Sequence, residues 1–434
     1  MTNKPGTASA QSVPLRTSFY YGWVIVAVGV LVTFMQSGMS NPMLSVFMKP
    51  MEAEFGWSRG TISVATTIGS LLGGPLGLVL GPVMDKHGSR AILALGSILL
   101  GAAMFGLALT ASLWQFYLFF SIGRMIFMGA TTVALGVAVS NWFIRKRGRA
   151  LGVAYMGDRV GGALLPFLSL FIITSYNWRW AWVALGIIVW VLAVIPTAVL
   201  IRRRPEDVGM LPDGEASKGP ASVSVSATEL EMTYTLNEAM RTPTFWMLAG
   251  ISGIFYMVVG AANLHQLPHM LDVGVPTPLA VGAISLISLC AGLGTVTWGF
   301  LVDRLGPRRC LIINYVIATL SMIALVMTRD TVMAYVYAVL YGFSLGGGTP
   351  LLMVAWANYY GRGALARIRG TTTLFNQILN ALGPAVAGIL YDMNQSYTLP
   401  FLLFALAYAV SVVFAFLSTP PGPPKRLAKQ ETPA

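Results

Sequence analysis

The sequence predicts an all-α membrane protein whose twelve transmembrane helices form two pseudo-symmetric bundles of six. Of its 434 residues, 56% are hydrophobic and only 10% are charged, whereas soluble proteins carry about 25% charged residues. The apolar residues fall into twelve runs long enough to cross a bilayer, and a charged motif after the second run recurs after the eighth. These observations exclude an ordinary soluble enzyme, a nucleic-acid-binding protein and a disordered scaffold.

Each apolar run is interpreted as one helix, because a hydrocarbon core about 30 Å thick needs roughly 20 apolar residues. The runs are continuous and do not alternate in segments of about ten residues, which excludes a β-barrel. The first run is long enough to span, so it predicts an uncleaved helix and not a signal peptide. The predicted spans are 19–40, 60–83, 91–111, 114–142, 150–174, 178–201, 244–267, 277–301, 310–328, 331–358, 370–390 and 397–418.

Two polar tails and one polar loop divide the chain into its predicted parts. The loop is rich in Ser, Gly, Pro and acidic residues, which is typical of a flexible linker, and a short amphipathic helix is expected near Thr233–Met240. The parts are a cytoplasmic N-terminal tail (1–18), a first six-helix bundle (19–201), a cytoplasmic central loop (202–243), a second six-helix bundle (244–418) and a cytoplasmic C-terminal tail (419–434).

The 28 Lys and Arg residues predict the orientation of the spans. With the N-terminus in the cytoplasm, 22 of them lie on the inner side, four lie outside, and two, Arg124 and Arg159, fall within spans. This asymmetry is what the positive-inside rule requires. We therefore expect a multi-pass protein of the cell inner membrane with both termini cytoplasmic. Its net charge of +12 reflects topology and predicts no nucleic-acid partner.

A duplicated motif marks the loop after the second span of each half. The first glycine of the motif leaves room for a neighbouring helix. The aspartate stands at a helix C-terminus, where the helix dipole disfavours negative charge, so it needs a cationic partner. The arginine can supply that partner or cap helix carbonyls. Four positions recur 218 residues apart: Gly81, Asp85, Gly88 and Arg90 return as Gly299, Asp303, Gly306 and Arg308.

This pattern, G-x-x-x-D-[RK]-x-G-x-R in both halves, resembles the mark of the major facilitator superfamily of secondary transporters. The resemblance covers essentially the whole chain. It implies the major facilitator fold, with a substrate site between the two bundles near the midplane and alternating access by rocking of one bundle against the other. It also implies that the duplicated set is a gating latch, which holds the halves together on the cytoplasmic side while the cavity is open outward. The alternative is a plain topology determinant.

Three ionisable residues lie deep in the predicted spans, where a charge is costly unless it is paired or hydrated. Arg124 lies about ten residues into the fourth span, and Asp158 and Arg159 about nine into the fifth, so all three are near the midplane at about 1.5 Å per residue. Their net charge of +1 favours an anionic substrate. We expect Asp158 to pair with one arginine while the other binds the substrate anion. The alternative is a structural pair that braces spans four and five.

The remaining candidates are uncharged polar side chains within spans: Asn263, His265, Tyr341, Asn376 and Gln377. His265 titrates near physiological pH and, like Asp158, can carry a proton; the alternative is a hydrogen-bonding side chain near the interface. Asn376 and Gln377 can donate hydrogen bonds to a carboxylate, with helix packing as the alternative. Pro268 is expected to break the seventh span.

Within the superfamily, the chain is most similar to the monocarboxylate and oxalate–formate transporter group. Many members of that group carry an arginine in span eight that binds the substrate carboxylate, but residues 277–301 contain no charged residue. Carboxylate recognition therefore falls to Arg124 or Arg159, or the substrate is not a simple monocarboxylate. The resemblance rests on Phe55-Gly56-Trp57-Ser58-Arg59, Asn141-Trp142-Phe143, Arg145-Lys146-Arg147-Gly148, Asn177-Trp178-Arg179-Trp180, His265-Gln266-Leu267-Pro268, Ala381-Leu382-Gly383-Pro384, Gly388 and Asp392.

Together these features predict a secondary active transporter that moves a small organic anion, a carboxylate, by alternating access with proton symport. The alternatives are an anion exchanger and a proton-coupled exporter of amphipathic compounds; outside transport, the alternative is a transporter-like receptor. The sequence contains no phosphate-binding loop and no His/Cys/Glu cluster with metal spacing, so no enzyme activity, cofactor or metal is expected. The expected partners are the anion, protons and the bilayer, and we expect a functional monomer.

Overall fold

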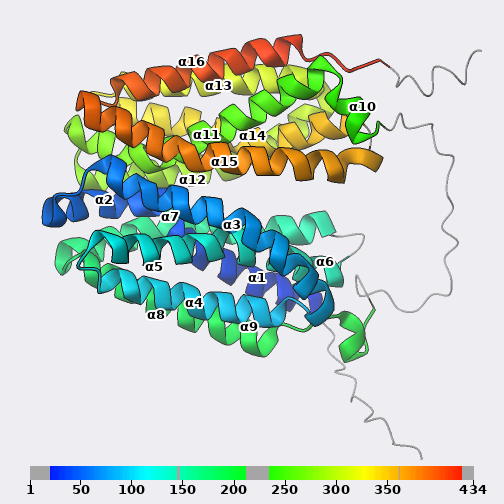
Figure 1. Ribbon diagram of the computed structural model, residues 1–434, viewed down its shortest axis with the longest axis horizontal. Coiled ribbons are helices and arrows are strands. Elements are labelled where there is room, and N and C mark those ends of the chain that lie inside the picture. Colours follow the sequence, from blue (N-terminus) through cyan, green and yellow to red (C-terminus); the bar gives the residue numbers. More distant parts are fainter. Residues whose placement is uncertain (1–19, 144–146, 212–233, 361, 423–434) are drawn as a thin grey trace, which may run out of the picture.

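The computed structural model describes residues 20–143, 147–211, 234–360 and 362–422. Within these ranges it defines all side chains except those of residues 78, 81–82, 85–87, 147–148 and 362–370. The described chain consists of long helices that run side by side in two bundles, one for each half of the sequence (Figure 1).

The first half comprises α1 (Gly22–Gln36), η1 (Ser37–Met39), α2 (Asn41–Phe55), α3 (Arg59–His87), α4 (Arg90–Ala108), α5 (Leu113–Met125), η2 (Ile126–Thr131), α6 (Thr132–Trp142), α7 (Arg147–Ser175), α8 (Trp178–Val189), η3 (Trp190–Val194) and α9 (Ile195–Leu200). The connection contains η4 (Pro205–Val208) and α10 (Leu236–Met240). The second half comprises α11 (Pro243–Asp272), α12 (Thr277–Leu305), α13 (Pro307–Val326), α14 (Thr331–Tyr360), α15 (Arg362–Asn394) and α16 (Thr398–Leu417).

These helices form the twelve spans that the sequence predicts. Eleven helical segments are long and apolar enough to cross a membrane. The twelfth span is α3, whose length of 29 residues equals that of α12, one of the eleven. Three spans of the first half are composite, namely α1–η1–α2, α5–η2–α6 and α8–η3–α9. The first span is longer than predicted, because Ser40 caps a new helical segment by accepting a hydrogen bond from the Met43 amide.

The prediction that Pro268 breaks the seventh span is wrong. α11 continues through Pro268 to Asp272, and Pro50 lies in the same way inside α2. A proline inside a span is tolerated where neighbouring groups satisfy the carbonyl that it frees. The two prolines are 218 residues apart, the same spacing as in the duplicated motif.

The repeat extends well beyond that motif. Adding 218 to the bounds of α3, 59 and 87, gives the bounds of α12, 277 and 305; adding it to the start of α5, 113, and the end of α6, 142, gives the bounds of α14, 331 and 360. The loops repeat too, since φ is positive at Gly56 and Gly274 (66° and 91°) and at Gly88 and Gly306 (82° and 77°). Only glycine adopts such angles readily, so both halves share one backbone plan.

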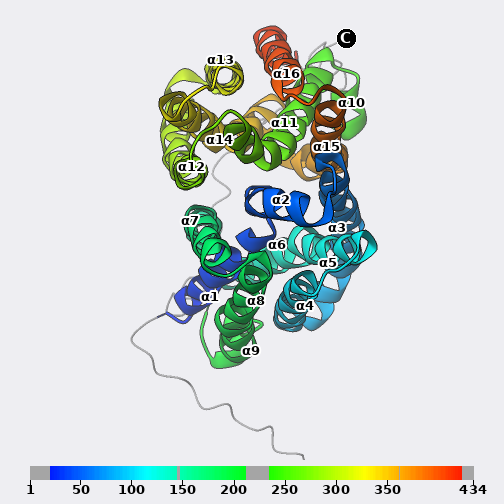
Figure 2. The same cartoon turned by 90° about the vertical axis from the view of Figure 1, so that its left-hand side faces the viewer.

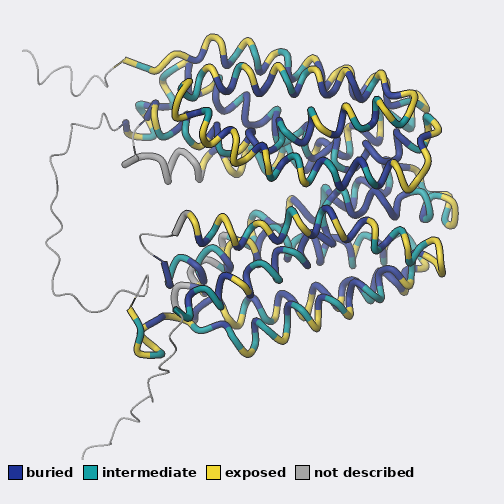
Figure 3. The backbone as a smooth tube through the Cα atoms, turned by 180° about the vertical axis from the view of Figure 1, so that it is seen from behind, coloured by how far each residue is buried: buried dark blue, intermediate teal, exposed yellow. Residues whose placement is uncertain are grey.

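The two halves face each other through α2, α3 and α7 on one side and α11, α12 and α15 on the other (Figure 2). One end of the molecule, on the right in Figure 1, contains the start of α1, the short helix α10 and the end of α16. We call it the termini end. Loops 56–58 and 273–276 lie at the other end, which we call the closed end. The halves converge there and diverge toward the termini end (Figure 3).

The central loop is described only near its ends. The short helix expected near Thr233–Met240 is α10, which begins after Thr235; the Thr235 hydroxyl and the Glu238 carboxylate form a reciprocal capping box there. The predicted N-terminal tail (1–18) and residues 212–233 of the central loop lie outside the described residues, as do residues 423–434 of the predicted C-terminal tail.

Candidate functional site

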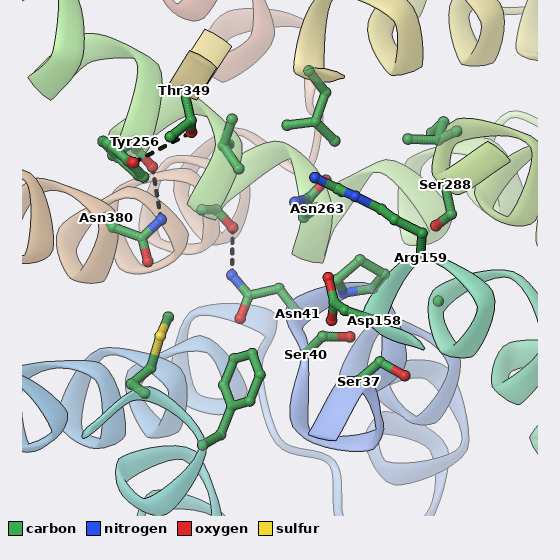
Figure 4. Close-up of a pocket in the computed structure, with 18 of the residues that line it drawn as sticks. Ser37, Ser40, Asn41, Asp158, Arg159, Tyr256, Asn263, Ser288, Thr349 and Asn380 are labelled. Atoms are coloured by element: carbon green, nitrogen blue, oxygen red, sulfur yellow. Dashed lines mark hydrogen bonds between the residues drawn. The ribbon is translucent and has the colours of Figure 1, made fainter. Parts of the chain in front are cut away.

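A central cavity of about 370 Å³ lies between the two halves (Figure 4). The first half lines it from η1, α2, α5, η2 and α7, and the second half from α11, α12, α14 and α15. Its polar lining residues are Ser37, Ser40, Asn41, Arg124, Asp158, Arg159, Tyr256, Asn263, Gln266, Ser288, Thr349, Gln377 and Asn380. All of the charged side chains in this lining come from the first half.

Arg124 forms a buried part of the cavity wall. Its side chain leaves α5 one residue before the end of that helix, where the π-helical segment η2 begins; such segments occur often at functional sites. Nη1 donates to the Met39 carbonyl at 2.8 Å and Nε to the Ser70 hydroxyl at 3.2 Å, and the guanidinium lies 5.2 Å from the Phe127 ring centre. The residue is only 3% exposed, so neighbours within its own half hold this arginine in place.

Asp158 and Arg159 project from α7 into the cavity. Gly157 and Gly161 press α7 against α1, since a Cβ on either glycine would lie within 2.4 Å of an α1 carbonyl oxygen. Successive helix positions turn by about 100°, so Arg159 points away from α1, and Figure 4 shows it extending toward Asn263 of α11. Among the described residues, neither side chain has a hydrogen bond or an ion pair within 4.0 Å. The expected Asp158–arginine pair is therefore not in direct contact in this conformation, although both Arg159 and Arg124 lie close enough to act on the Asp158 carboxylate electrostatically.

The second half contributes amides and hydroxyls to the cavity wall. Asn263 and Gln266 line it from α11, and each accepts a hydrogen bond from a tyrosine of α14: Tyr341 donates to Asn263 Oδ1 at 3.1 Å, and Tyr337 donates to Gln266 Oε1. Tyr341, expected to contact the substrate, is thus buried behind Asn263 and does not line the cavity.

His265 lies next to Gln266 in sequence but points away from the cavity. It is completely buried, with Nε2 2.9 Å from the Pro384 carbonyl and Nδ1 2.9 Å from the Tyr397 hydroxyl. A carbonyl can only accept, so Nε2 carries the proton and Nδ1 accepts from Tyr397. Nε2 is also 3.1 Å from Ser63 of α3, which makes His265 a satisfied contact between the halves and leaves it outside the cavity lining.

The Asn376–Gln377 pair is split in the same way. Gln377 lines the central cavity, whereas Asn376 accepts a hydrogen bond from Ser252 at 2.9 Å and lines a smaller pocket beside it. The sequence missed Asn380, one turn further along α15, and Tyr256 and Thr349. Asn380 Nδ2 donates to the Tyr256 carbonyl at 2.9 Å. Asn380 is three residues from Gln377, and this spacing, which places both on one face of the helix, is the signal that could have identified it.

The duplicated motif lies at the termini end. Arg90 donates to the carbonyl of Ala198 in α9, and Arg308 donates to that of Phe416 in α16; in both cases the two residues are 108 apart. Asp303 is exposed, and a Cβ on Gly299 would meet no atom of the described residues within 4 Å. The side chains of Gly81 and Asp85 lie outside the described set.

An ion-pair cluster joins the halves at the closed end. Arg59, in the first turn of α3, forms a two-pronged contact with Asp272 at the end of α11, with Nη2 and Oδ1 2.8 Å apart. Lys49 Nζ lies 2.9 Å from the same carboxylate, and Glu52 lies 3.3 Å from Arg59 Nε. The Arg59 guanidinium also packs 4.2 Å from the Tyr391 ring centre.

A second contact closes this end between α3 and α15. The Asp392 carboxylate accepts hydrogen bonds from the Ser58 hydroxyl at 2.7 Å and the Gly60 amide at 3.1 Å, so it caps the positive N-terminus of α3. The backbones meet at Gly60 and Gly388, where a Cβ on Gly388 would lie 2.7 Å from Gly60 Cα. The two halves are therefore held together at the closed end by both sets of contacts.

Comparison with known proteins agrees with this architecture. The family model of the Major Facilitator Superfamily matches residues 26–293 and 266–434. The chain is 25% identical over 427 residues to monocarboxylate transporter 12-B of Danio rerio, covering 91% of this chain and 86% of that one. It is 22% identical over 421 residues to the MFS-type transporter YcxA of Bacillus subtilis (strain 168), covering 93% and 95%.

A solved structure has the same fold. It is a bacterial homologue of the human lysosomal transporter Spinster in an inward-facing and occupied conformation, with a TM-score of 0.72 at 17% identity, over 96% of this chain and 100% of that one. With twelve spans, a cavity between two repeated halves and no enzyme among these relatives, the chain belongs to the major facilitator superfamily and is a transporter near its monocarboxylate group.

Proposed function

We propose that the protein is a proton-coupled symporter of a small organic anion, a monocarboxylate. One observation carries this proposal: Arg159 reaches into the central cavity without an ion-pair partner among the described residues, beside the only acidic side chain of the cavity lining. A guanidinium presents paired N–H donors that match the two oxygens of a carboxylate. Arg124, held by backbone and hydroxyl groups, adds positive charge behind it.

Asp158 is the proposed proton carrier. With Asp158 ionised, the three charged side chains sum to +1, and the carboxylate competes with a substrate anion for the field of the arginines. Protonation raises the sum to +2, and binding of a monoanion returns it to +1. The loaded and empty cavities then carry equal charge, so the rocking step moves the same charge in both directions. His265 has no part in this step, because it lies outside the cavity lining with its ring nitrogens engaged.

We further propose that the termini end faces the cytoplasm of a cell with the protein in its inner membrane, and that the chain works as a monomer. The excess of basic residues near this end supports the orientation. The conformation described above is then closed to the outside. In the transition to the outward-open state, the ion-pair cluster at the closed end must separate and the two halves must come together at the termini end. In that state the proposed gating latch, formed by Gly81, Asp85, Arg90, Gly299, Asp303 and Arg308, holds the termini end shut.

Uptake by proteoliposomes tests the proposal. A pH difference of one unit, acidic outside, is expected to drive up to about tenfold accumulation of a monocarboxylate, since one pH unit is equivalent to tenfold in concentration for one-to-one symport. The Asp158→Asn variant is expected to lose this pH-driven accumulation and to keep exchange of internal for external substrate. Glu206→Gln, which neutralises an exposed acid in η4, is the matched control and is expected to behave as wild type.

Two results would contradict the proposal. If Asp158→Asn still accumulates substrate with the pH gradient, Asp158 does not carry the proton. If no carboxylate is taken up while lipophilic amphipathic compounds are transported, the protein is an exporter of such compounds and not an anion symporter.

A further inference from the structure

A second recess lies at the termini end, in the second half of the protein. It has a volume of about 490 Å³, lies between the start of α13 and the end of α16, and shares no lining residue with the central cavity. Among the described residues that line it, Arg308 and Arg309 are basic and none is acidic, while Ile312 and Phe416 form an apolar wall. A recess with cationic and apolar walls suits an amphipathic anion.

Arg308 has a hydrogen-bond donor to spare in this recess. Its Nη2 donates to the Phe416 carbonyl, and its guanidinium lies 5.5 Å from the Phe416 ring centre, so the side chain is held in place. Its Nε is buried and has no hydrogen-bond partner among the described residues. Buried polar groups are satisfied in the great majority of cases, so this donor points to a ligand that supplies the acceptor. Arg309, exposed beside it, offers a second guanidinium.

The corresponding place in the first half is occupied by the chain itself. A Cβ on Gly88 would lie 3.0 Å from the Arg203 side chain, whereas a Cβ on Gly306, 218 residues later, would meet no atom of the described residues within 4 Å. The charge differs too, because Ala91 stands where the second half has Arg309. The shared backbone plan therefore does not require this recess or its second arginine.

The recess lies where an apolar outer surface ends. α13 and α16 pack against each other along the outer edge of the second half (Figures 1 and 2). Both carry exposed apolar side chains, among them Ile313, Val316, Val413 and Leu417, as expected of a surface that contacts acyl chains. α13 begins at Pro307 and α16 ends at Leu417, so the two arginines stand at the level where lipid headgroups meet that surface.

We propose that this recess binds an anionic phospholipid. Its phosphate accepts hydrogen bonds from Arg308 Nε and from the Arg309 guanidinium, a donor type that matches phosphate oxygens, and an acyl chain lies against Ile312 and Phe416. Basic pockets between membrane helices are suited to such headgroups. A free phosphate ion shares the phosphoryl chemistry, but it has no use for the apolar wall. The inference does not depend on what the central cavity transports.

Native mass spectrometry of the purified full chain tests the inference. The probes are phosphatidylglycerol and phosphatidylcholine with the same acyl chains, each titrated into the protein in detergent. Wild type is expected to bind its first phosphatidylglycerol molecule about tenfold more tightly than its first phosphatidylcholine molecule. The reason is that phosphatidylcholine carries the same phosphate but adds a cationic group, which the two arginines repel.

Three variants assign the site. Arg308→Gln and Arg309→Gln are each expected to weaken phosphatidylglycerol binding about fivefold, and so to reduce the preference to about twofold. Arg90→Gln is the matched control, because Arg90 makes the same contact with a helix carbonyl in the first half but has Ala91 beside it. This variant loses the same charge and is expected to keep the wild-type preference.

Four results would contradict the inference. Equal binding of the two lipids by wild type would mean that the recess does not select an anionic headgroup. A preference that survives in both Arg308→Gln and Arg309→Gln would place the lipid elsewhere. An equal loss in Arg90→Gln would mean that the basic surface attracts anionic lipid in general. Inorganic phosphate separates the two sources of phosphate. If it raises the unfolding temperature of wild type but not of Arg308→Gln, and wild type shows no lipid preference, the recess binds a soluble ion and the assignment to a lipid is wrong.

Discussion

The two halves of the protein share one backbone plan but supply different chemistry to the cavity. The first half provides the charges, Arg124, Asp158 and Arg159. Adding 218 to these numbers gives the corresponding residues of the second half, which are Gly342, Asn376 and Gln377. The three charged side chains of the first half therefore correspond to a glycine and two neutral amides in the second half.

The second half also has an arrangement of side chains that the first half lacks. The second half orients two amides with stacked tyrosines, using Asn263, Gln266, Tyr337 and Tyr341. Subtracting 218 gives Ser45, Met48, Phe119 and Gly123 in the first half, which cannot form that arrangement. The repeated features, such as the positive-φ glycines and the helix prolines, maintain the scaffold. The residues compared here, at which the repeat is broken, line or support the cavity, and they give it a charged side and a neutral side.

The largest effect is expected from removing the charge that distinguishes the halves. Arg159→Gln installs the amide found at the corresponding position, Gln377, and is expected to weaken monocarboxylate binding about 100-fold, because a two-pronged charge-assisted contact is worth about 3 kcal/mol. Gln377→Leu is expected to weaken it less than about fivefold. Binding titrations on the purified variants measure both, with the unfolding temperature of the free protein as the check on folding.

If Arg159→Gln and Gln377→Leu lose equal binding affinity for the monocarboxylate, the proposed difference between the two halves is wrong. A loss confined to Arg124→Gln, with Arg159→Gln close to wild type, would instead move the anion site to the buried arginine and make Arg159 a bystander.

The sequence predicted the fold, and it also identified the charged side chains that line the cavity, for a physical reason. A continuous apolar run of about 20 residues has few interpretations other than a span, and a charge within such a run stands out because it is costly there. Arg124, Asp158 and Arg159 were therefore identifiable from sequence, and all three line the cavity.

The neutral half of the site was not predictable in the same way. The polar residues near the end of α11, Asn263, His265, Gln266 and His269, do not share one face of the helix, so their pattern does not show which of them points into the cavity. His265 and Gln266 are adjacent in sequence, yet only Gln266 lines the cavity. Asn376 and Gln377 are likewise adjacent, yet only Gln377 lines the central cavity. Helix rotation depends on close contacts such as that of Gly383 with the Met257 carbonyl, which involve residues far apart in the chain.

An effect of intermediate size is expected from neutralising one of two acidic residues that occupy corresponding positions in the two halves. Asp272 corresponds to Glu54, but Glu54 pairs with Arg179 inside its own half, 2.5 Å apart, whereas Asp272 pairs with Arg59 of the other half. Asp272→Asn leaves the Arg59 side chain, which is 4% exposed, with a weaker partner. We expect the opening equilibrium of the closed end to shift about tenfold toward open, equivalent to about 1.4 kcal/mol.

Spin-label distances across the closed end measure this shift. Tyr176 in the first half and Val332 in the second are each 73% exposed, so labels there do not disturb packing. Glu54→Gln is the matched control and is expected to leave the distance distribution unchanged. A shift of equal size in both variants would mean that the acids act through general stability, and would remove the distinction between a contact within a half and a contact between halves.

The smallest effect is expected where the halves do not differ. Arg90 and Arg308 each donate to a carbonyl near the end of the last helix of their own half, where a cation also favours the helix dipole. Arg90→Gln and Arg308→Gln are each expected to lower the free energy of unfolding by about 1 kcal/mol, seen as similar small decreases in unfolding temperature. Arg309→Gln, at an exposed neighbour, should leave that temperature unchanged. Equal losses would mean that the repeat preserves energetics as well as backbone shape. A loss in only one variant would mean that the halves have diverged in stability too, so that a broken repeat position could no longer be taken as a sign of function.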